Sequence, residues 1–212
     1  LSILIRKPLL TKKLKRKNTE QHHVDDWKQL AEFLNIKWNE KRPWFNIRKL
    51  RKENDVRYLL KSDIDESACK WAIHPGGRVR EHLWPQELFA KAIKEIFIPK
   101  SIQTIIIKPP NFHLINELYK IAPVVKAPTM QSLLTLLSYF DGILCNDTAI
   151  SHAGTALGKP VLTIFNAGNS NIFSPRGNEN NVIKKQDCNC HPCIGNCIVP
   201  NIICNHQISL EE

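Results

Sequence analysis

The sequence predicts an α/β fold: a Rossmann-like parallel sheet with helices on both faces. From about residue 69 onward, short apolar runs alternate with amphipathic segments of helical length. Turn-forming glycine, proline and asparagine residues separate the two kinds of segment. Strands that alternate with helices in this way are joined by helical crossovers, so they pair in parallel and are covered on both faces.

The expected strands are short runs rich in apolar and β-branched residues, at 70–74, 103–107, 124–125, 142–145 and 161–165. The expected helices lie between them, at 85–97, 111–121, 130–140 and 148–157. Three residues support the helix ends. Pro85 suits a first turn, Asn111 is a good N-cap, and Gly158 is a typical stop after a last turn.

The length of 212 residues predicts one domain with an appendage. Residues 61–212 are expected to form the Rossmann-like domain with a cysteine-rich tail. Residues 1–60 are expected to be a basic segment with a helix at 24–34 and a linker at 37–55. Because the chain lacks an initiating Met, we expect a fragment or a processed piece. No apolar run is long enough for a membrane span or a secretory signal, which predicts a cytoplasmic protein.

Positive charge is concentrated towards the N-terminus. Residues 1–60 contain 16 Lys and Arg against 7 Asp and Glu, whereas residues 61–212 contain 14 against 13. The densest run consists of Lys12, Lys13, Lys15, Arg16 and Lys17. Such a run could contact anionic lipid or a phosphorylated acceptor; it could equally be a solvated helix face. We expect no nucleic acid, because no aromatic residues are interleaved with these charges.

Ligands of such sheets bind beyond the carboxyl ends of the strands, so the loops that follow the strands are the candidate sites. The loop after the first strand reads His74-Pro75-Gly76-Gly77-Arg78-Val79-Arg80. Its glycines allow a close backbone approach, and Arg78 and Arg80 add positive charge that suits a diphosphate. The alternative is a plain Pro-Gly-Gly turn.

The loop after the strand at 142–145 opens the helix expected at 148–157. A helix N-terminus presents free N–H groups and a partial positive charge, which suit an anion. The hydroxyl of Thr148 can donate a hydrogen bond, and His152 falls one turn later on the same helix face. In the alternative interpretation Asp147 is a helix cap and His152 a half-buried histidine. The loop at 165–169 is a third, weaker candidate.

Five of the seven cysteines lie in the tail, as Cys188-x-Cys190-x2-Cys193-x3-Cys197-x6-Cys204. The Cys-x2-Cys step has the spacing of a zinc or iron–sulfur ligand pair, so a structural metal held by Cys190, Cys193, Cys197 and Cys204 is one hypothesis. Reduced cysteines in a compact tail, or two disulfides, are the alternatives. The two other cysteines, Cys69 and Cys145, are expected to be small core residues.

Three segments in this order resemble glycosyltransferase family 9, the ADP-heptose:lipopolysaccharide heptosyltransferases. The most specific is 144–161, LCNDTAISHAGTALGKPV, in which a strand is followed by Asp-Thr, a His one turn later, and a small-residue run ending in Gly-Lys-Pro. The loop at 74–80 followed by Trp84-Pro85-x-x-x-Phe89 is the second, and the cysteine tail is the third. The resemblance extends from about residue 12 to the C-terminus.

The resemblance implies the C-terminal half of a two-domain GT-B glycosyltransferase. Residues 1–60 would then be the basic remnant of its N-terminal domain with the interdomain linker, and the protein would lie in the cytoplasm or peripherally at the inner membrane. It implies an inverting, metal-independent transfer of heptose from ADP-heptose to the lipopolysaccharide inner core, without a catalytic cofactor. The general base would lie on the N-terminal domain, which we expect this chain to lack, so the chain alone is expected to be inactive. The donor-binding residues carried over by position are Arg78, Arg80, Asp147, Thr148, Ala149 and His152.

Two departures from the family pattern keep alternatives open. Ala149 stands where the family usually has glycine, and the loop 108–113 contains no carboxylate for the donor ribose before Glu117. One alternative is therefore a non-catalytic nucleotide-binding remnant of such a transferase. Another is a sugar-nucleotide epimerase of GT-B architecture, and a third is a basic nucleic-acid-binding protein with a metal-stabilised tail.

Overall fold

A computed structural model describes residues 18, 20–41, 43–53, 55–60, 65, 67–177, 180–184, 197 and 203–211. The basic run at 12–17 and the cysteines at 188, 190 and 193 lie outside these residues. The chain divides into two compact units, one formed by Leu1–Glu40 with Asn171–Phe173, the other by Lys41–Ser170 with Ser174–Glu212. The second unit contains the sheet.

In the first unit, the helix predicted at 24–34 is confirmed as α2 (His23–Phe33). Its N-cap is His22, whose Nδ1 accepts a hydrogen bond of 3.1 Å from the backbone N–H of Val24. Asp25 and Asp26 in the first turn complement the positive end of the helix dipole. The sequence pattern and local capping are therefore sufficient to explain this element.

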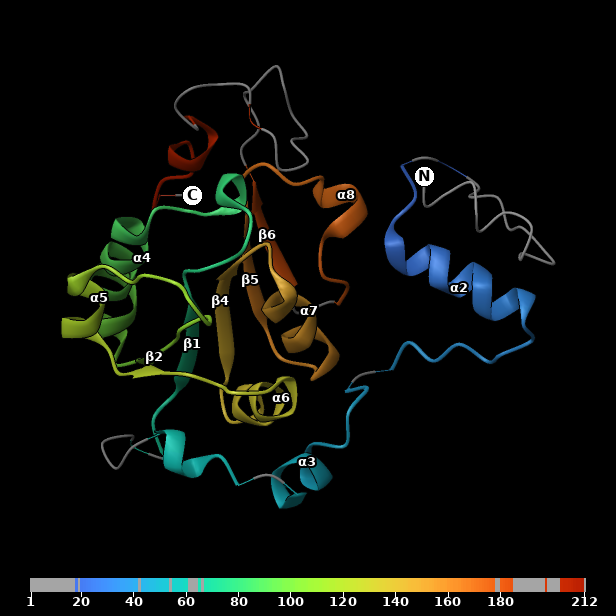
Figure 1. Cartoon of the computed structure of the whole chain (residues 1–212), viewed down its shortest axis with the longest axis horizontal. Coiled ribbons are helices and arrows are strands. Elements are labelled where there is room, and N and C mark those ends of the chain that lie inside the picture. Colours follow the sequence, from blue (N-terminus) through green and yellow to red (C-terminus); the bar gives the residue numbers. More distant parts are fainter. Residues whose placement is uncertain are drawn as a thin grey trace. The chain divides into compact units, whose positions relative to one another are not determined.

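The second unit is built on a six-stranded parallel sheet with the strand order β3-β2-β1-β4-β5-β6 (Figure 1). Its strands are β1 (Lys70–His74), β2 (Gln103–Ile107), β3 (Val124–Val125), β4 (Gly142–Asn146), β5 (Val161–Phe165) and β6 (Asn180–Lys184). The five predicted strands are confirmed, to within one residue at their ends. The polar strand β6 was not predicted, because Asn180 and Asn181 break its apolar run.

Alternate strand residues point into two separate hydrophobic cores, as the two-residue period of a strand requires. Ala72 and Ile143 belong to one core, and their neighbours Ile73 and Leu144 belong to the other. The first core is covered by α3 (Ile47–Glu53), η2 (Arg57–Leu60), α6 (Met130–Ser138) and α7 (Ala149–Ala156). The second is covered by α4 (Gln86–Ala92), its π-helical continuation η4 (Ile93–Phe97) and α5 (Asn116–Ile121).

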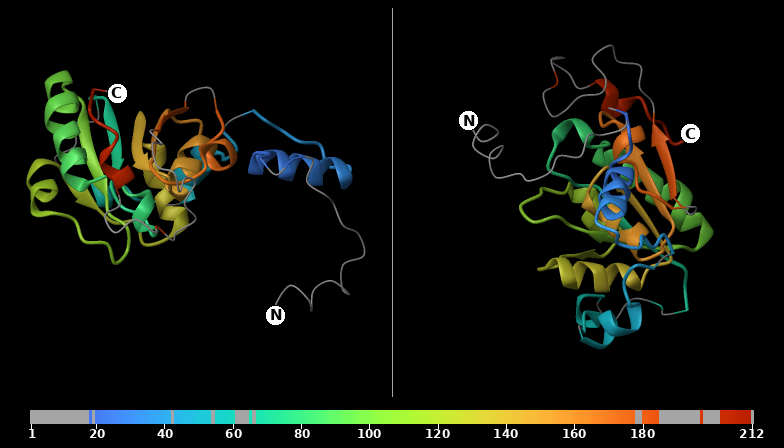
Figure 2. Two further views of the ribbon diagram at one scale, coloured as in Figure 1. Left: turned by 90° about the horizontal axis from the view of Figure 1, so that it is seen from above. Right: turned by 90° about the vertical axis from the view of Figure 1, so that its right-hand side faces the viewer.

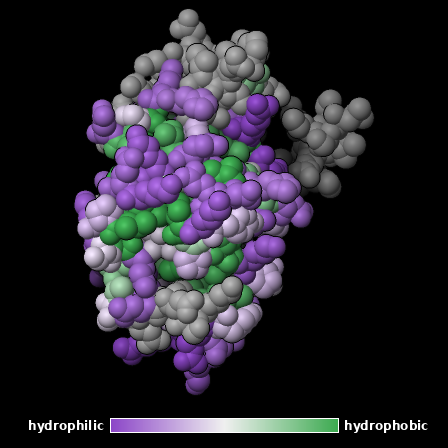
Figure 3. Space-filling model, turned by 90° about the vertical axis from the view of Figure 1, so that its left-hand side faces the viewer, coloured by the Kyte–Doolittle hydropathy of each residue, from purple (hydrophilic) through white to green (hydrophobic). Residues whose placement is uncertain are grey.

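The two helix layers are visible on opposite sides of the sheet in Figure 2. On the side that carries α4 and α5, hydrophilic residues dominate the surface, with hydrophobic ones showing between them (Figure 3). A sheet buried on both faces beneath amphipathic helices is the predicted fold class, which is thus confirmed. Across the described residues, each helix is too short or too polar to cross a bilayer.

Three local expectations were wrong. The helix predicted from 111 begins at Asn116, because Asn111 instead adopts a left-handed turn with φ 55°, a conformation that asparagine tolerates. The linker predicted at 37–55 contains α3, which is attached to α6 by Arg51: its Nε donates to Ser138 Oγ at 2.9 Å, and its guanidinium lies over the ring of Tyr139. Cys69 is exposed at the start of β1, whereas Cys145 is buried as expected.

Candidate functional site

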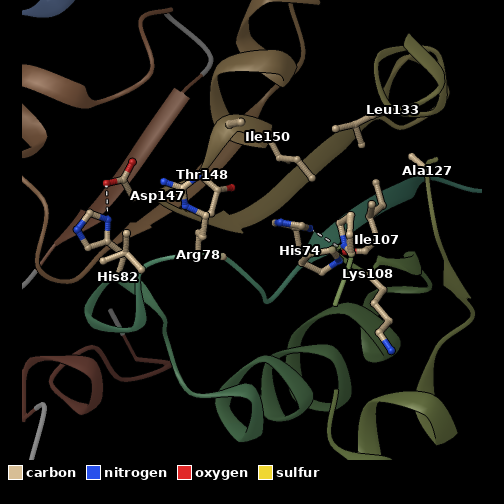
Figure 4. A pocket seen from close by; sticks show the side chains of 15 residues that line it. His74, Arg78, His82, Ile107, Lys108, Ala127, Leu133, Asp147, Thr148 and Ile150 are labelled. Carbon is tan, nitrogen blue, oxygen red and sulfur yellow. Dashed lines mark hydrogen bonds and ion pairs between the residues drawn. The ribbon is translucent and has the colours of Figure 1, made fainter. Parts of the chain in front are cut away.

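The sheet changes direction between β1 and β4. From β1 the chain crosses to β2 and β3 on one side, and from β4 it crosses to β5 and β6 on the other. The loops after β1 and β4 therefore diverge, which leaves a crevice at the carboxyl ends of these neighbouring strands. A pocket of about 300 Å³ lies there (Figure 4). It is lined by His74, Gly77, Arg78, Val79, His82, Ile107, Lys108, Pro109, Pro110, Ala127, Leu133, Asp147, Thr148, Ala149 and Ile150.

The loop after β1 is held in place by Asn146, the fully buried last residue of β4. Asn146 Oδ1 accepts from the backbone N–H of Trp84 at 2.9 Å, and its Nδ2 donates to the carbonyl of Pro75 at 2.9 Å. Gly77 lies so close to Thr148 that an added Cβ would sit 3.1 Å from its Cγ2. Because Gly77 has no side chain, the loop can lie against the start of α7. The next residue, Arg78, therefore lines the same pocket as Thr148.

Thr148 is the N-cap residue of α7, yet its side chain caps no backbone N–H. Its Oγ1 is buried and has no hydrogen-bond partner. A buried hydroxyl without a partner costs free energy, and such exceptions require an explanation. A ligand atom in the pocket would satisfy this hydroxyl, and the adjoining helix N-terminus favours a ligand that is anionic.

A histidine–carboxylate pair lies beside Thr148. His82 Nδ1 is 3.1 Å from Asp147 Oδ2, and the two side chains are only 18% and 12% exposed. The other ring nitrogen, His82 Nε2, is buried without a partner. Gly168, in the loop after β5, packs against the pair: a Cβ there would lie 2.6 Å from Asp147 Oδ2. The three loops that follow β1, β4 and β5 therefore meet at this pair.

A second histidine, His74, ends β1 inside the pocket. Its Nδ1 lies 2.7 Å from the backbone carbonyl oxygen of Ile107. Burial lowers the pKa of His74 to about 4, although the bond to Ile107 opposes this shift. The ring is therefore neutral at physiological pH, which makes His74 a fixed dipole rather than a charge.

The opposite end of the pocket is apolar. Ile107, Ala127, Leu133 and Ile150 lie there, apart from Arg78 and Thr148 (Figure 4). Lys108 is directed away from the centre of the pocket, and its Nζ donates to the hydroxyl of Tyr119 at 2.9 Å. The pocket thus has one polar end with a cation and a helix N-terminus, and one apolar end that suits a flat ring.

The structure brings four of the six predicted donor-binding residues together. Arg78, Asp147, Thr148 and Ala149 all line the pocket. Ala149 has an ordinary helical backbone, so this position does not require a glycine conformation. Arg80, on the short helix η3 (Arg80–His82), and His152, on α7, are both exposed and are not among the lining residues.

His74 and His82 were not identified as site residues from the sequence. Their partners, Ile107 and Asp147, lie far away along the chain, so no local spacing links them. The signal that could have found them is position: both flank the loop after a strand, where parallel sheets bind their ligands. Of the proposed metal ligands, Cys204 is buried and Cys197 half-buried. Cys190 and Cys193 lie outside the described residues, and the described part of the chain holds no cluster of three metal-ligating side chains.

The chain is similar to known glycosyltransferases in sequence and in fold. The model of glycosyltransferase family 9 (heptosyltransferase) matches residues 7–202. A family 9 glycosyl transferase from Veillonella parvula superposes with a TM-score of 0.64 at 16% identity, over 87% of this chain and 56% of that one. The E. coli heptosyltransferase WaaC with ADP superposes with a TM-score of 0.59 at 15% identity, over 84% of this chain and 54% of that one.

The iron-containing dodecameric glycosyltransferase TibC from enterotoxigenic E. coli gives a TM-score of 0.55 at 13% identity, over 68% of this chain and 42% of that one. No curated protein sequence matches. At these identities the structures establish a shared fold, and this chain spans about half the length of each. The family match covers most of the chain, from the basic run to the cysteine tail. The protein therefore belongs to glycosyltransferase family 9, the heptosyltransferase family.

Proposed function

We propose that this chain binds the nucleotide-sugar donor of a heptosyltransferase that transfers heptose from ADP-heptose to the lipopolysaccharide inner core. The observation that carries the proposal is the buried, unpaired hydroxyl of Thr148 at the start of α7. It lies in a pocket at the switch point of the sheet, with Arg78 on the facing loop. An anion placed between them would receive a hydroxyl, a guanidinium and helix N–H groups.

The two ends of the pocket match the two ends of ADP. The diphosphate would lie at Thr148 and Arg78, and the adenine would lie against the apolar end formed by Ile107, Leu133 and Ile150. Solved family members with ADP or an ADP-heptose analogue are consistent with a donor of this class. The sugar would then extend from the polar end, past the His82–Asp147 pair.

In transfer, the acceptor hydroxyl attacks the anomeric carbon and the nucleoside diphosphate leaves. Negative charge grows on the departing diphosphate, and Thr148, Arg78 and the start of α7 are placed to stabilise it. Asp147 is the one carboxylate among the described lining residues, and it is paired with His82. We therefore assign deprotonation of the acceptor to the N-terminal domain of the family's two-domain architecture.

Calorimetric titration of this chain with ADP tests the proposal. Thr148→Val keeps the shape of the side chain but removes the hydroxyl, and it should weaken ADP binding about tenfold. Thr155→Val is the matched control, because Thr155 is buried on the same helix with its hydroxyl donating to Ser151, and it does not line the pocket. Absence of ADP binding to the folded chain, or equal losses in both variants, would reject the proposal.

A second candidate function is nucleotide binding without transfer. The pairing of the pocket's carboxylate Asp147 with His82 favours it, since no other described lining residue is a carboxylate. The two candidates share ADP binding and differ in turnover. Incubating this chain, joined to the N-terminal domain that supplies the base, with ADP-heptose and a heptose-free lipopolysaccharide core, and then analysing the core by mass spectrometry, separates them: only the transferase adds the mass of a heptose.

For the tail we propose a structural metal, zinc or an iron–sulfur cluster, held by Cys190, Cys193, Cys197 and Cys204. The Cys-x2-Cys spacing supports it, as do the burial of Cys204 and the presence of iron in TibC. Metal analysis of the purified chain tests it. About one metal site per chain, lost in Cys193→Ser and kept in Cys69→Ser, is the expected result.

We also propose that the basic run at 12–17 contacts anionic lipid at the cytoplasmic face of the inner membrane.

A further inference from the structure

We propose that His74 recognises a hydroxyl group of the donor's ribose, and so selects ribonucleotides at this site. The inference rests on the proposed donor site and adds to it a residue that determines specificity. It begins from the hydrogen bond between His74 Nδ1 and the carbonyl oxygen of Ile107, 2.7 Å long. A carbonyl oxygen can only accept, so Nδ1 must carry the proton.

The protonation of Nδ1 determines what the other nitrogen can do. In a neutral imidazole whose Nδ1 carries the proton, Nε2 has a lone pair and can only accept a hydrogen bond. Only 6% of the surface of His74 is exposed, and this burial keeps the ring neutral. None of the described residues donates to Nε2, which lies on the side of the ring away from Ile107, within the pocket (Figure 4). His74 therefore presents a permanent acceptor to whatever occupies the pocket.

The position of His74 indicates which ligand group it meets. In Figure 4 it lies between the polar end, with Arg78 and Thr148, and the apolar end, with Ile107 and Leu133. In a nucleoside diphosphate the ribose connects the base to the phosphates, so the ribose would pass His74. In a nucleotide sugar both phosphates are fully ionised at neutral pH and can only accept hydrogen bonds, whereas ribose hydroxyls can donate them.

The remaining polar side chains do not supply this function. Asp147 lies at the polar end, and its Oδ2 is occupied by His82. Lys108, which follows Ile107, is directed towards Tyr119 and has no acceptor atom. The loop 108–113 contains no carboxylate that could accept from a ribose hydroxyl. His74 Nε2 is thus the side-chain acceptor that the middle of the pocket offers in the described part of the chain.

Two substitutions separate the two nitrogens. His74→Asn can place an amide N–H near Nδ1, which keeps the bond to Ile107, but it ends short of the Nε2 position. His74→Gln reaches the Nε2 position with an oxygen and gives up the bond to Ile107. The experiment measures the affinities of the wild-type chain and both variants for ADP, 2′-deoxy-ADP, 3′-deoxy-ADP and IDP by calorimetry, with circular dichroism as a check of folding.

We expect the wild-type chain to bind ADP about tenfold more tightly than one of the two deoxy analogues. His74→Asn should abolish this preference with the fold intact, and His74→Gln should retain part of it. Equal affinities of the wild-type chain for ADP and both deoxy analogues would overturn the inference while leaving the donor site in place. The inference would also be overturned if His74→Asn changed only the ratio of the affinities for ADP and IDP, because His74 would then contact the adenine amino group. Failure of the wild-type chain to bind ADP at all would instead reject the proposed function.

Discussion

His82 Nδ1 lies 3.1 Å from Asp147 Oδ2, and this contact joins the loops after β1 and β4 at the polar end of the pocket. If the donor diphosphate binds there, the carboxylate of Asp147 lies close to it, and His82 Nδ1 is placed to donate a hydrogen bond to that carboxylate. We therefore expect His82→Ala to weaken ADP binding about tenfold, the size of one charge-assisted hydrogen bond. Calorimetric titration of the variant checks this.

A double-mutant cycle with Asp147→Asn shows whether the effect passes through the pair. In the Asp147→Asn background there is no carboxylate for His82 to pair with, so His82→Ala should cost much less than in the wild-type chain. Equal costs in both backgrounds would mean that His82 acts independently of Asp147.

Thr148→Val should change stability and binding in opposite directions. The hydroxyl it removes is buried and unpaired, so the free energy of unfolding should stay the same or rise by about 1 kcal/mol. Thermal melts with and without ADP test this pair of effects. At an ADP concentration 100 times the wild-type Kd, ligand binding stabilises the wild-type chain by about 2.7 kcal/mol, and the variant should gain clearly less. A destabilised variant would mean that the hydroxyl has a structural partner.

Gly168→Ala should disturb the His82–Asp147 pair, although Gly168 itself does not line the pocket. An added Cβ would lie 2.6 Å from Asp147 Oδ2 and 3.3 Å from His82 Cε1, so the carboxylate has to move. Because the carboxylate is the flexible end of its side chain, most of the protein can remain in place. We expect ADP affinity to fall about tenfold with a modest loss of stability, about 1 kcal/mol. Gly158→Ala, at a left-handed helix end away from the pocket, is the comparison: it should lower stability and leave ADP affinity unchanged.

The stability of the protein should depend on pH through His74. The pKa of His74 is lowered to about 4 in the folded chain, whereas it is 6.5 when the chain is unfolded. The unfolded chain therefore takes up the proton first as the pH falls. The stabilisation is fully present above pH 6.5, and it is lost as the pH falls from there towards about 4.

The total loss from this one group is about 3 kcal/mol. Urea denaturation at a series of pH values measures it. His74→Gln cannot titrate, so its stability curve should be flatter across the same range. A wild-type curve with the same slope as that of the variant would show that His74 does not contribute.

Much of the fold could be predicted, because the relevant information is local. The runs QTIII at 103–107 and VLTIF at 161–165 are apolar and rich in β-branched residues, and the structure forms strands over the same ranges. Gly158 ends α7 with φ 71°, as a glycine after a helix commonly does. The helix α3 could not be predicted in this way. Its residues are mostly basic, and its position depends on Arg51 reaching Ser138, which no local pattern shows.

The candidate site could be predicted in its backbone and only partly in its side chains. The loops at 74–80 and 147–152 were identified because parallel sheets bind ligands at strand ends, and both contribute to the pocket. The directions of individual side chains depend on tertiary contacts. Arg78 and Arg80 are alternate residues of one loop, yet only Arg78 lines the pocket. His74 acquires its role from a carbonyl on the neighbouring strand.

The buried amide of Asn146 has a consequence for how this site could change over evolution. It holds both ends of the first loop, at Pro75 and Trp84, from a position inside the sheet. Exposed residues between those two anchors, such as Arg78 and Arg80, can be exchanged while the loop keeps its course. New donor preferences are therefore accessible by single substitutions at these exposed positions, with little risk to the folded state.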